Sequence, residues 1–359
     1  MMDYFFFILC LLSLNNLKIK GINEFFEDYL NLENTNSIKG IFVWLIMFAH
    51  KLEYIDNKNY LFIKIIGHLG QQIVSMFFFY SGFGIFESVK KKGFSYAKTL
   101  PNKSFILFIK YQIILLIYLT ANIFILKKKI TFKMFFLSAI FKYAIGNSNW
   151  FAFSIIVFYN YSYLSFRFIN NNIYIGIIII SLICFCHSIF VYYYFYPGKA
   201  YAIGSNPCFL TGIYFSYTKS ILNKLILKND ICYFSITSII IFIYYEFQRF
   251  KSFINFLIRN TLFSLLIILI SIKVKFNNEF LLFINSHSFS IYLIQRLIFW
   301  IDYRKKIFVK SDFFQISFEF TFILFFATLF DKYTCFIDKY FLKNHVNNYI
   351  PLNNIYLKN

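Results

Sequence analysis

The sequence predicts an all-α fold, a polytopic bundle of about ten or eleven transmembrane helices. Of its 359 residues, 59% are hydrophobic and only 14% are charged, whereas a soluble domain carries about 25% charged residues. The mean hydropathy is +0.61, and apolar runs of membrane-spanning length recur along the whole chain. Because lipid offers no hydrogen bonds to the backbone, we expect each run to be helical.

The N-terminal apolar run, at 4–14, is the first expected element. It follows an acidic residue and precedes no small-residue cleavage site, which favours an interfacial or half-inserted helix over a signal peptide. A full span is the alternative. We therefore treat 1–35 as an N-terminal extension, 36–343 as the membrane domain and 344–359 as a polar tail.

The expected spans of the membrane domain follow one another with short connections, and the segment at 132–145 is the weakest of them. In order they are 38–54, 71–89, 104–126, 132–145, 150–169, 173–196, 201–217, 231–247, 253–272, 279–301 and 313–336. No stretch between them is long enough for a soluble catalytic domain. Any chemistry is therefore expected inside the helical bundle.

The formal net charge is +20, and basic residues cluster between the apolar runs, at 90–92, 127–129, 219–228 and 304–306. Such clusters are typical of the positive-inside rule and of contact with anionic headgroups, so we expect membrane lipids rather than nucleic acid as partners. A cytoplasmic loop at 90–103 places Lys39 near the cytoplasmic face and directs His50 outward. The basic residues at 127–133 oppose this orientation if 132–145 is a full span.

The six cysteines are scattered, and none has the paired spacing of a zinc site or of a disulfide framework. We interpret them as small apolar core residues. The sequence also lacks the glycine-rich phosphate loop, the G-x-S-x-G elbow and the H-E-x-x-H zinc motif.

Two residues of the first firm span, Lys39 and His50, are eleven positions apart. Eleven steps of about 100° close about three turns, so both side chains share one helix face, roughly 16 Å apart along the axis. An ionisable group deep in a bilayer is costly and indicates a functional site. A neutral imidazole suits a general base, and a lysine near the membrane surface suits a phosphate-bearing ligand.

The other four histidines are weaker candidates. His187 lies in the middle of a span, where a structural role is favoured, and His287 lies at a predicted membrane edge. His68 precedes the second span, in a loop or at the mouth of a site, and His345 is in the polar tail.

A second cluster lies at 76–87, where Ser81, Gly82 and Gly84 interrupt an aromatic span. Small residues at such a place permit either close helix packing or the approach of a ligand to the backbone. The sequence leaves both interpretations open.

These residues resemble the acyltransferase-3 family of bacterial integral membrane O-acyltransferases. The resemblance begins with a basic residue, ten positions and a histidine on the first core span, followed by F-F-F-Y-S-G-F-G-I at 77–85. Three further elements follow in the family's order: N-W-F at 149–151, F-L-T-G-I-Y at 209–214 and S-F-S-I-Y-L-I at 288–294. Two positions depart from the family pattern, because its common arginine is Lys39 here and its late histidine is Gln295.

The resemblance implies a multi-pass protein of the cytoplasmic (inner) membrane with no metal and no permanently bound cofactor. It would move an acyl group, usually acetyl, from a donor such as acetyl-CoA to a hydroxyl of a cell-surface polysaccharide or its lipid-linked precursor. His50 would be the general base or would carry the acyl group transiently, and Lys39 would contact the donor. The residues that would line the site are Gln71, Tyr80, Ser81 and Trp150.

A transporter or flippase for a lipid-linked oligosaccharide is the alternative, since it fits the span count and the basic charge equally well. Such a protein would not need a deep histidine aligned with a cation, and it often has internal repeats, which we do not find. A glycan polymerase or ligase is the third class considered. Those proteins usually have a large periplasmic loop, for which the non-apolar stretches here are too short.

Overall fold

The computed structural model describes residues 2–55, 60–67, 69–167, 172–249, 252–307 and 312–343. The protein is about 81% helical with almost no sheet, which confirms the all-α fold. The tail at 344–359 lies outside the described residues, and so do His68 and His345.

The expected count of ten or eleven transmembrane helices is not confirmed, because only six stretches of the described residues are long and apolar enough to cross a membrane and several short helices lie between the long ones. In chain order the elements are α1 (Met2–Ser13), β1 (Lys18–Ile19), α2 (Leu32–Lys51), α3 (Leu61–Ile66), α4 (Gly70–Lys92), α5 (Phe94–Ala97), α6 (Leu100–Thr120), α7 (Phe132–Ala139), α8 (Trp150–Arg167), α9 (Ile173–Phe190), α10 (Asn206–Ile226), α11 (Asp230–Arg249), α12 (Phe253–Lys273), β2 (Val274–Lys275), α13 (Glu279–Ser286), α14 (Ser288–Lys305) and α15 (Asp312–Lys343). A π-helical turn extends α6 (Ala121–Ile125), and another extends α9 (Val191–Phe195).

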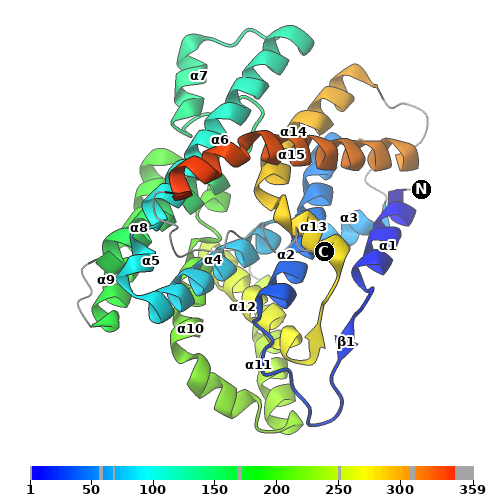
Figure 1. Cartoon of the computed structure of the whole chain (residues 1–359). Helices are drawn as coiled ribbons and strands as arrows, with labels where there is room; N and C mark the ends of the chain where they lie inside the picture. The colour runs from blue at the N-terminus through cyan, green and yellow to red at the C-terminus, as the bar shows by residue number, and fades with distance from the viewer. Residues whose placement is uncertain are drawn as a thin grey trace.

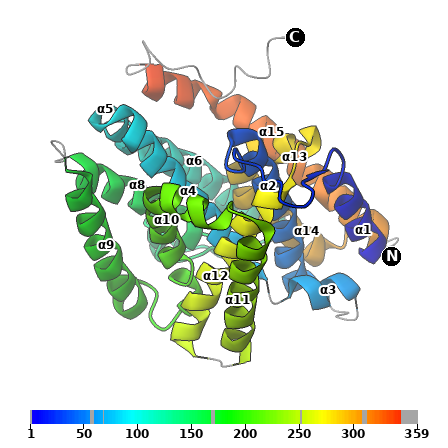
Figure 2. The same ribbon diagram turned by 90° about the horizontal axis from the view of Figure 1, so that it is seen from below.

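Six helical stretches among the described residues are long and apolar enough to cross a membrane: Gly70–Lys92, Phe94–Ile125, Ile173–Phe195, Asp230–Arg249, Phe253–Lys273 and Phe313–Phe341. They divide into central and peripheral helices. Most of α4 is buried, whereas a single residue of α11, Tyr233, is buried. Figure 2 shows α9 and α11 at the perimeter of the bundle. Exposed apolar side chains on such helices fit a lipid-facing surface.

The helix α2 lies near the centre of the bundle, where it packs against α4, α13 and α14 (Figure 2). It is not one of the six apolar stretches, because its first turns, at 32–37, are mostly polar. Its N-terminus is capped by Asn31, whose side chain accepts from the backbone N–H of Asn34. Protein neighbours around α2 allow it polar groups that lipid would not satisfy.

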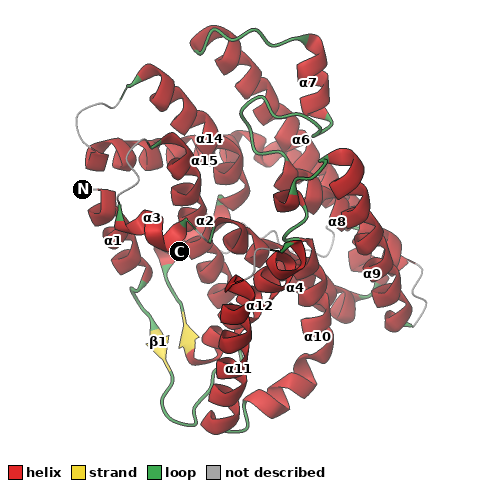
Figure 3. Cartoon of the chain, turned by 180° about the vertical axis from the view of Figure 1, so that it is seen from behind, coloured by secondary structure: helices red, strands yellow, loops and turns green. Residues whose placement is uncertain are grey.

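The bundle has two ends, which we name after the two residues on α2. The Lys39 end contains the β1–β2 pair and the start of α2, since the backbone N–H of Phe276 donates to Asn34. The His50 end contains α7 and the loop that follows it, where Asn122 donates to the carbonyl of Ile145. Figure 3 shows the strands and α7 at opposite ends of the molecule.

Three expected spans differ clearly from the structure, and one of them, expected at 201–217, is shifted along the chain to α10. The segment at 132–145 forms only the eight-residue α7, which is too short to cross a bilayer. The expected span at 279–301 is divided into α13 and α14 at His287, whose Nδ1 lies 2.6 Å from Oδ2 of Asp331. Ser290 binds the other oxygen of the same carboxylate, so polar contacts with α15 accompany the break. The sequence Asn285-Ser286-His287-Ser288 supplies the residues of this break.

The terminal helices cover one side of α2. In α1 the ring of Phe6 contacts Trp44 and Phe48, and Trp44 donates to the hydroxyl of Ser13. The long α15 crosses the bundle from α1 to α6 (Figure 1). An ion pair between Lys110 of α6 and Asp338 of α15 lies on this path.

Candidate functional site

His50, in the last turn of α2, is the centre of a polar cluster where α2 contacts α14. Its Nδ1 lies 3.3 Å from Oε1 of Glu53 and 3.2 Å from Nε of Arg296. Arg296 also forms an ion pair with Glu53. The imidazole meets the ring of Tyr292 edge-on, with centroids 6.2 Å apart. Its Nε2 is buried and has no hydrogen-bonding partner among the described residues.

The proton of His50 has two possible positions in this cluster. When Nδ1 accepts the Nε–H of Arg296, the neutral ring carries its proton on Nε2. When Nδ1–H donates to Glu53, the lone pair of Nε2 is free. The second arrangement gives Nε2 the electron pair that a general base needs, and it places Glu53 where it stabilises the imidazolium that forms.

Lys39 lies two turns into α2, and its Nζ is 5.8 Å from the centre of the Tyr80 ring on α4. No carboxylate of the described chain lies within ion-pair distance of this half-buried ammonium. The Tyr80 hydroxyl is buried and likewise lacks a hydrogen-bonding partner in the described part of the chain. The Lys39 end of α2 therefore has a positive charge that is not neutralised, which suits an anionic ligand.

Lys39 and His50 lie on one continuous helix, as expected, but they contact different neighbours. Lys39 faces α4, and His50 faces α14. Phe151 of α8 connects these two neighbours, because its ring contacts Phe78 of α4 and Tyr292 of α14 at 5.3 and 4.7 Å. The two residues are thus three turns apart on a single element, roughly 16 Å along its axis.

Two of the expected lining residues come together at the His50 end. Gln71, in the first turn of α4, donates to the carbonyl of Tyr201 and to the hydroxyl of Ser205, each at 2.8 Å. The ring of Trp150, which begins α8, lies 6.1 Å from that of Tyr201. Tyr201 thus links Gln71 to Trp150, and nothing in its sequence context indicated this role.

The other two expected lining residues, Tyr80 and Ser81, point in different directions from α4. Tyr80 lies beside Lys39. Ser81 follows it on α4, so its side chain points about 100° away around the helix axis, and it is half-buried. The structure therefore associates Tyr80 with Lys39 and gives Ser81 a different direction.

The small residues of α4 and α10 mark a close helix crossing. A Cβ atom added at Gly82 would overlap the carbonyl oxygen of Phe209, and one added at Gly212 would overlap that of Phe79. Gly84, by contrast, has nothing within 4 Å of such an atom. For Gly82 and Gly212 the structure favours helix packing over ligand approach.

Arg296 is the residue at this site that sequence analysis missed. It directly follows Gln295, which is fully buried and donates to the carbonyl of Tyr292 in its own helix. An arginine inside the apolar run 289–301 is the same kind of signal that singled out His50. Its partner was not visible, because 246 positions separate the two residues.

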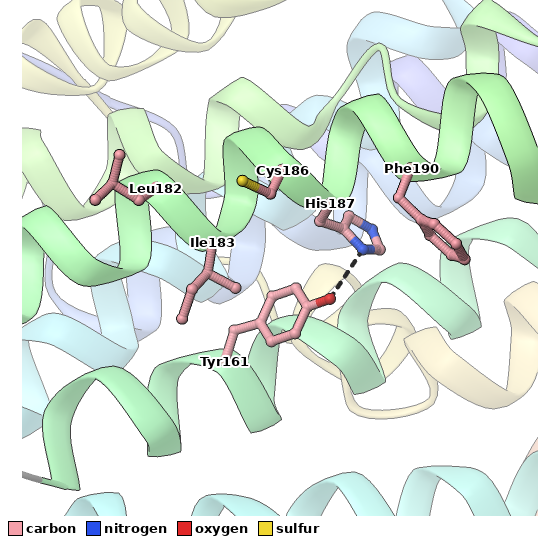
Figure 4. A pocket seen from close by; sticks show the side chains of 6 residues that line it. All are labelled: Tyr161, Leu182, Ile183, Cys186, His187 and Phe190. Carbon is pink, nitrogen blue, oxygen red and sulfur yellow. Dashed lines mark hydrogen bonds between the residues drawn. The ribbon is translucent and has the colours of Figure 1, made fainter.

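His187 and His287 have protein partners of their own. Nδ1 of His187 on α9 is 3.2 Å from the hydroxyl of Tyr161 on α8, beside an apolar cavity of about 320 Å³ (Figure 4).

At the α13–α14 break, His287 and Ser290 both bind Asp331. The carboxylate lies between serine and histidine there, which is not the order of a catalytic triad. In the part of the chain that the structure describes, no three His, Cys, Asp or Glu side chains are grouped as metal ligands.

Comparison of the chain with protein-family models, with curated proteins and with solved structures found no match. The function is therefore inferred from the residues of this chain and from the geometry of the site.

Proposed function

We propose that this protein is an integral membrane O-acyltransferase that moves an acyl group, most simply acetyl, from acyl-CoA to a hydroxyl of a cell-surface polysaccharide or its lipid-linked precursor. The observation that carries the proposal is the pairing of His50 with Glu53 and Arg296 at the end of α2, with an unneutralised Lys39 three turns earlier on the same helix. The sequence resemblance to the acyltransferase-3 family supports the same activity.

In the proposed reaction, His50 acts on the acceptor hydroxyl or on the thioester. The acceptor hydroxyl gives its proton to Nε2 of His50 while its oxygen attacks the thioester carbonyl carbon. The carbon–sulfur bond breaks, and the leaving thiolate takes the proton from the His50 imidazolium. In the covalent variant, Nε2 itself attacks the carbonyl and the thiolate leaves; the acyl group then passes to the acceptor oxygen, and the thiolate takes up the acceptor's proton. Glu53 stabilises the positive imidazole in both cases.

The donor would lie extended along α2. Lys39 provides a point charge for donor phosphate, and His50 is roughly 16 Å farther along the helix axis. Phosphate and reacting carbonyl must therefore lie at opposite ends of an extended molecule, which is the form of an acyl-CoA. Lys39 is at the same end as the basic residues 90–92, whose loop the positive-inside rule places in the cytoplasm.

Mass spectrometry of surface glycans tests this function. Cells expressing the wild type, no protein, or His50→Ala are compared at equal protein levels in the membrane. We expect acylated sugars only with the wild type. Equal acylation in all three would contradict the proposal. Glycans that are lost or shortened without the protein would instead support a flippase for a lipid-linked oligosaccharide.

A further inference from the structure

A polar cavity of about 560 Å³ opens at the Lys39 end of the bundle, between the last turns of α4 and the middle of α10. The side chains that matter in it are Glu87, Lys90, Ser216, Lys219, Ser220 and Asn223. Neither His50 nor Lys39 lines it, so it is distinct from the site on α2.

Glu87 and Lys90 are already satisfied by protein groups. Lys90 lies 2.5 Å from Oε1 of Glu87 and donates to the carbonyl of Ser216 at 2.8 Å. The hydroxyl of Ser216 donates to the same carboxylate oxygen at 2.6 Å. These bonds join α4 to α10 and neutralise one positive charge of the cavity.

Lys219 is the lysine of the cavity that takes no part in these contacts. It is half-buried, and its Nζ lies 5.7 Å from the ring centre of Tyr29 and 5.8 Å from that of Phe83. Within the described chain no carboxylate is at ion-pair distance from it, and Glu87 acts on it only at longer range. A half-buried ammonium without a counter-ion from the protein favours an anion from outside it.

Asn223, one turn after Lys219, supplies a neutral donor. Its Oδ1 accepts the hydroxyl of Tyr29 at 2.7 Å, which fixes the orientation of the amide. The amide NH₂ is then the group available to a ligand, together with the hydroxyl of Ser220. A cation surrounded by hydroxyl and amide donors is suited to a phosphate group.

The cavity and Lys39 lie along the same face of α4. Tyr80, Phe83, Glu87 and Lys90 recur at helical spacing on that face. Lys39 lies over the first of these residues, and Lys219 over the second. Both lysines thus contact the same stripe of one helix.

We propose that this cavity binds a phosphate group, with Lys219 as its cation and with Asn223 and Ser220 as hydrogen-bond donors. The phosphate has two possible sources, the coenzyme A part of a soluble acyl donor or the headgroup of an anionic lipid. The first source rests on the proposed function, and the second does not.

Ligand binding by Lys219 variants of the full-length protein tests the site. Lys219→Gln removes the charge, Lys219→Arg keeps it, and Lys224→Gln removes a matched charge from an exposed position five residues farther along α10. Coenzyme A binding is measured by calorimetry in detergent, and retention of phosphatidylglycerol over phosphatidylcholine by native mass spectrometry. Since Lys219→Gln removes a hydrogen bond between two charged groups, we expect it to weaken one ligand at least about tenfold.

The two arms identify the source of the phosphate. A Lys219-dependent change in coenzyme A affinity assigns a soluble donor, and a Lys219-dependent loss of phosphatidylglycerol assigns a headgroup. The arginine variant should retain the ligand, and it shows that a loss is not a folding defect. If Lys219→Gln behaves like Lys224→Gln in both arms, the site is refuted, while glycan acylation that still depends on His50 would leave the proposed function standing.

Discussion

The guanidinium of Arg296 approaches the imidazole of His50, with Nε 3.2 Å from Nδ1. Arg296 cannot lose its Nε proton, so this contact holds one tautomer of the ring, while Glu53 favours the other. Arg296 and Glu53 also form an ion pair, so the two groups that favour different tautomers of His50 contact one another. The reactivity of His50 thus depends on a helix far from it in sequence.

Glu53→Gln tests this arrangement. A glutamine cannot stabilise the imidazolium, so we expect acylation to fall at least roughly tenfold, although by less than the 10²–10⁴-fold that loss of a general base costs. Acylated glycan is quantified by mass spectrometry at equal protein levels. The matched control is Glu246→Gln, which breaks the exposed ion pair with Arg249. Equal acylation in the two variants would show that Glu53 does not act on His50.

Lys39 variants test the charge at the other end of α2. We expect Lys39→Arg to retain activity, because it keeps the positive charge beside Tyr80. Lys39→Ala should lose activity, and with purified protein the loss should appear as a raised KM for acyl-CoA. A removed point charge weakens donor binding more than the chemical step. Wild-type activity in Lys39→Ala would eliminate the donor role.

The sequence predicts much of this fold because lipid imposes one strong rule on every apolar run. The spans expected at 71–89, 231–247 and 253–272 correspond closely to α4, α11 and α12. The rule fails where runs contain several polar residues. The segment at 132–145 forms only α7, and the polar group at His287 interrupts the run between α13 and α14.

The sequence predicts which residues of the candidate site share a helix, but not which helices contact one another there. Helical spacing places Lys39 and His50 on α2, but it does not identify the neighbours of α2. The contacts with Tyr80 and Arg296 depend on how α4 and α14 are rotated about their axes. Tyr201 shows the same limit, since it joins Gln71 to Trp150 from a connecting segment with no motif.

Glycine substitutions test the crossing of α4 and α10. Alanine at Gly82 or Gly212 would force a methyl group onto a backbone carbonyl of the other helix, which cannot move as a side chain can. We expect each variant to lose about 1–3 kcal/mol of stability, as overpacking typically costs. Gly84→Ala is the control, because its site is open. Thermal unfolding in detergent measures the difference, and equal midpoints for all three variants would contradict the crossing.

The ion pair between Lys51 and Glu319 provides a test of how α15 is held against α2. Both side chains are almost completely buried, and Nζ lies 2.5 Å from Oε1. Breaking a buried pair by removing one partner costs about 3–5 kcal/mol, because the other charge stays buried without compensation. We therefore expect Lys51→Met and Glu319→Met each to lower the unfolding midpoint strongly. The double variant should recover much of the loss, since two apolar side chains replace two charges.

The pair of Lys110 and Asp338 is the comparison for this test, since it joins α15 to α6 with side chains that are 12% and 33% exposed. A single change there should cost less than one in the buried pair, toward the roughly 1 kcal/mol of accessible pairs, because a charge that solvent reaches gains little from its Coulomb attraction. Thermal unfolding in detergent measures all of these variants under one condition. Additive losses in the double variant of Lys51 and Glu319 would show that the two buried charges do not stabilise one another.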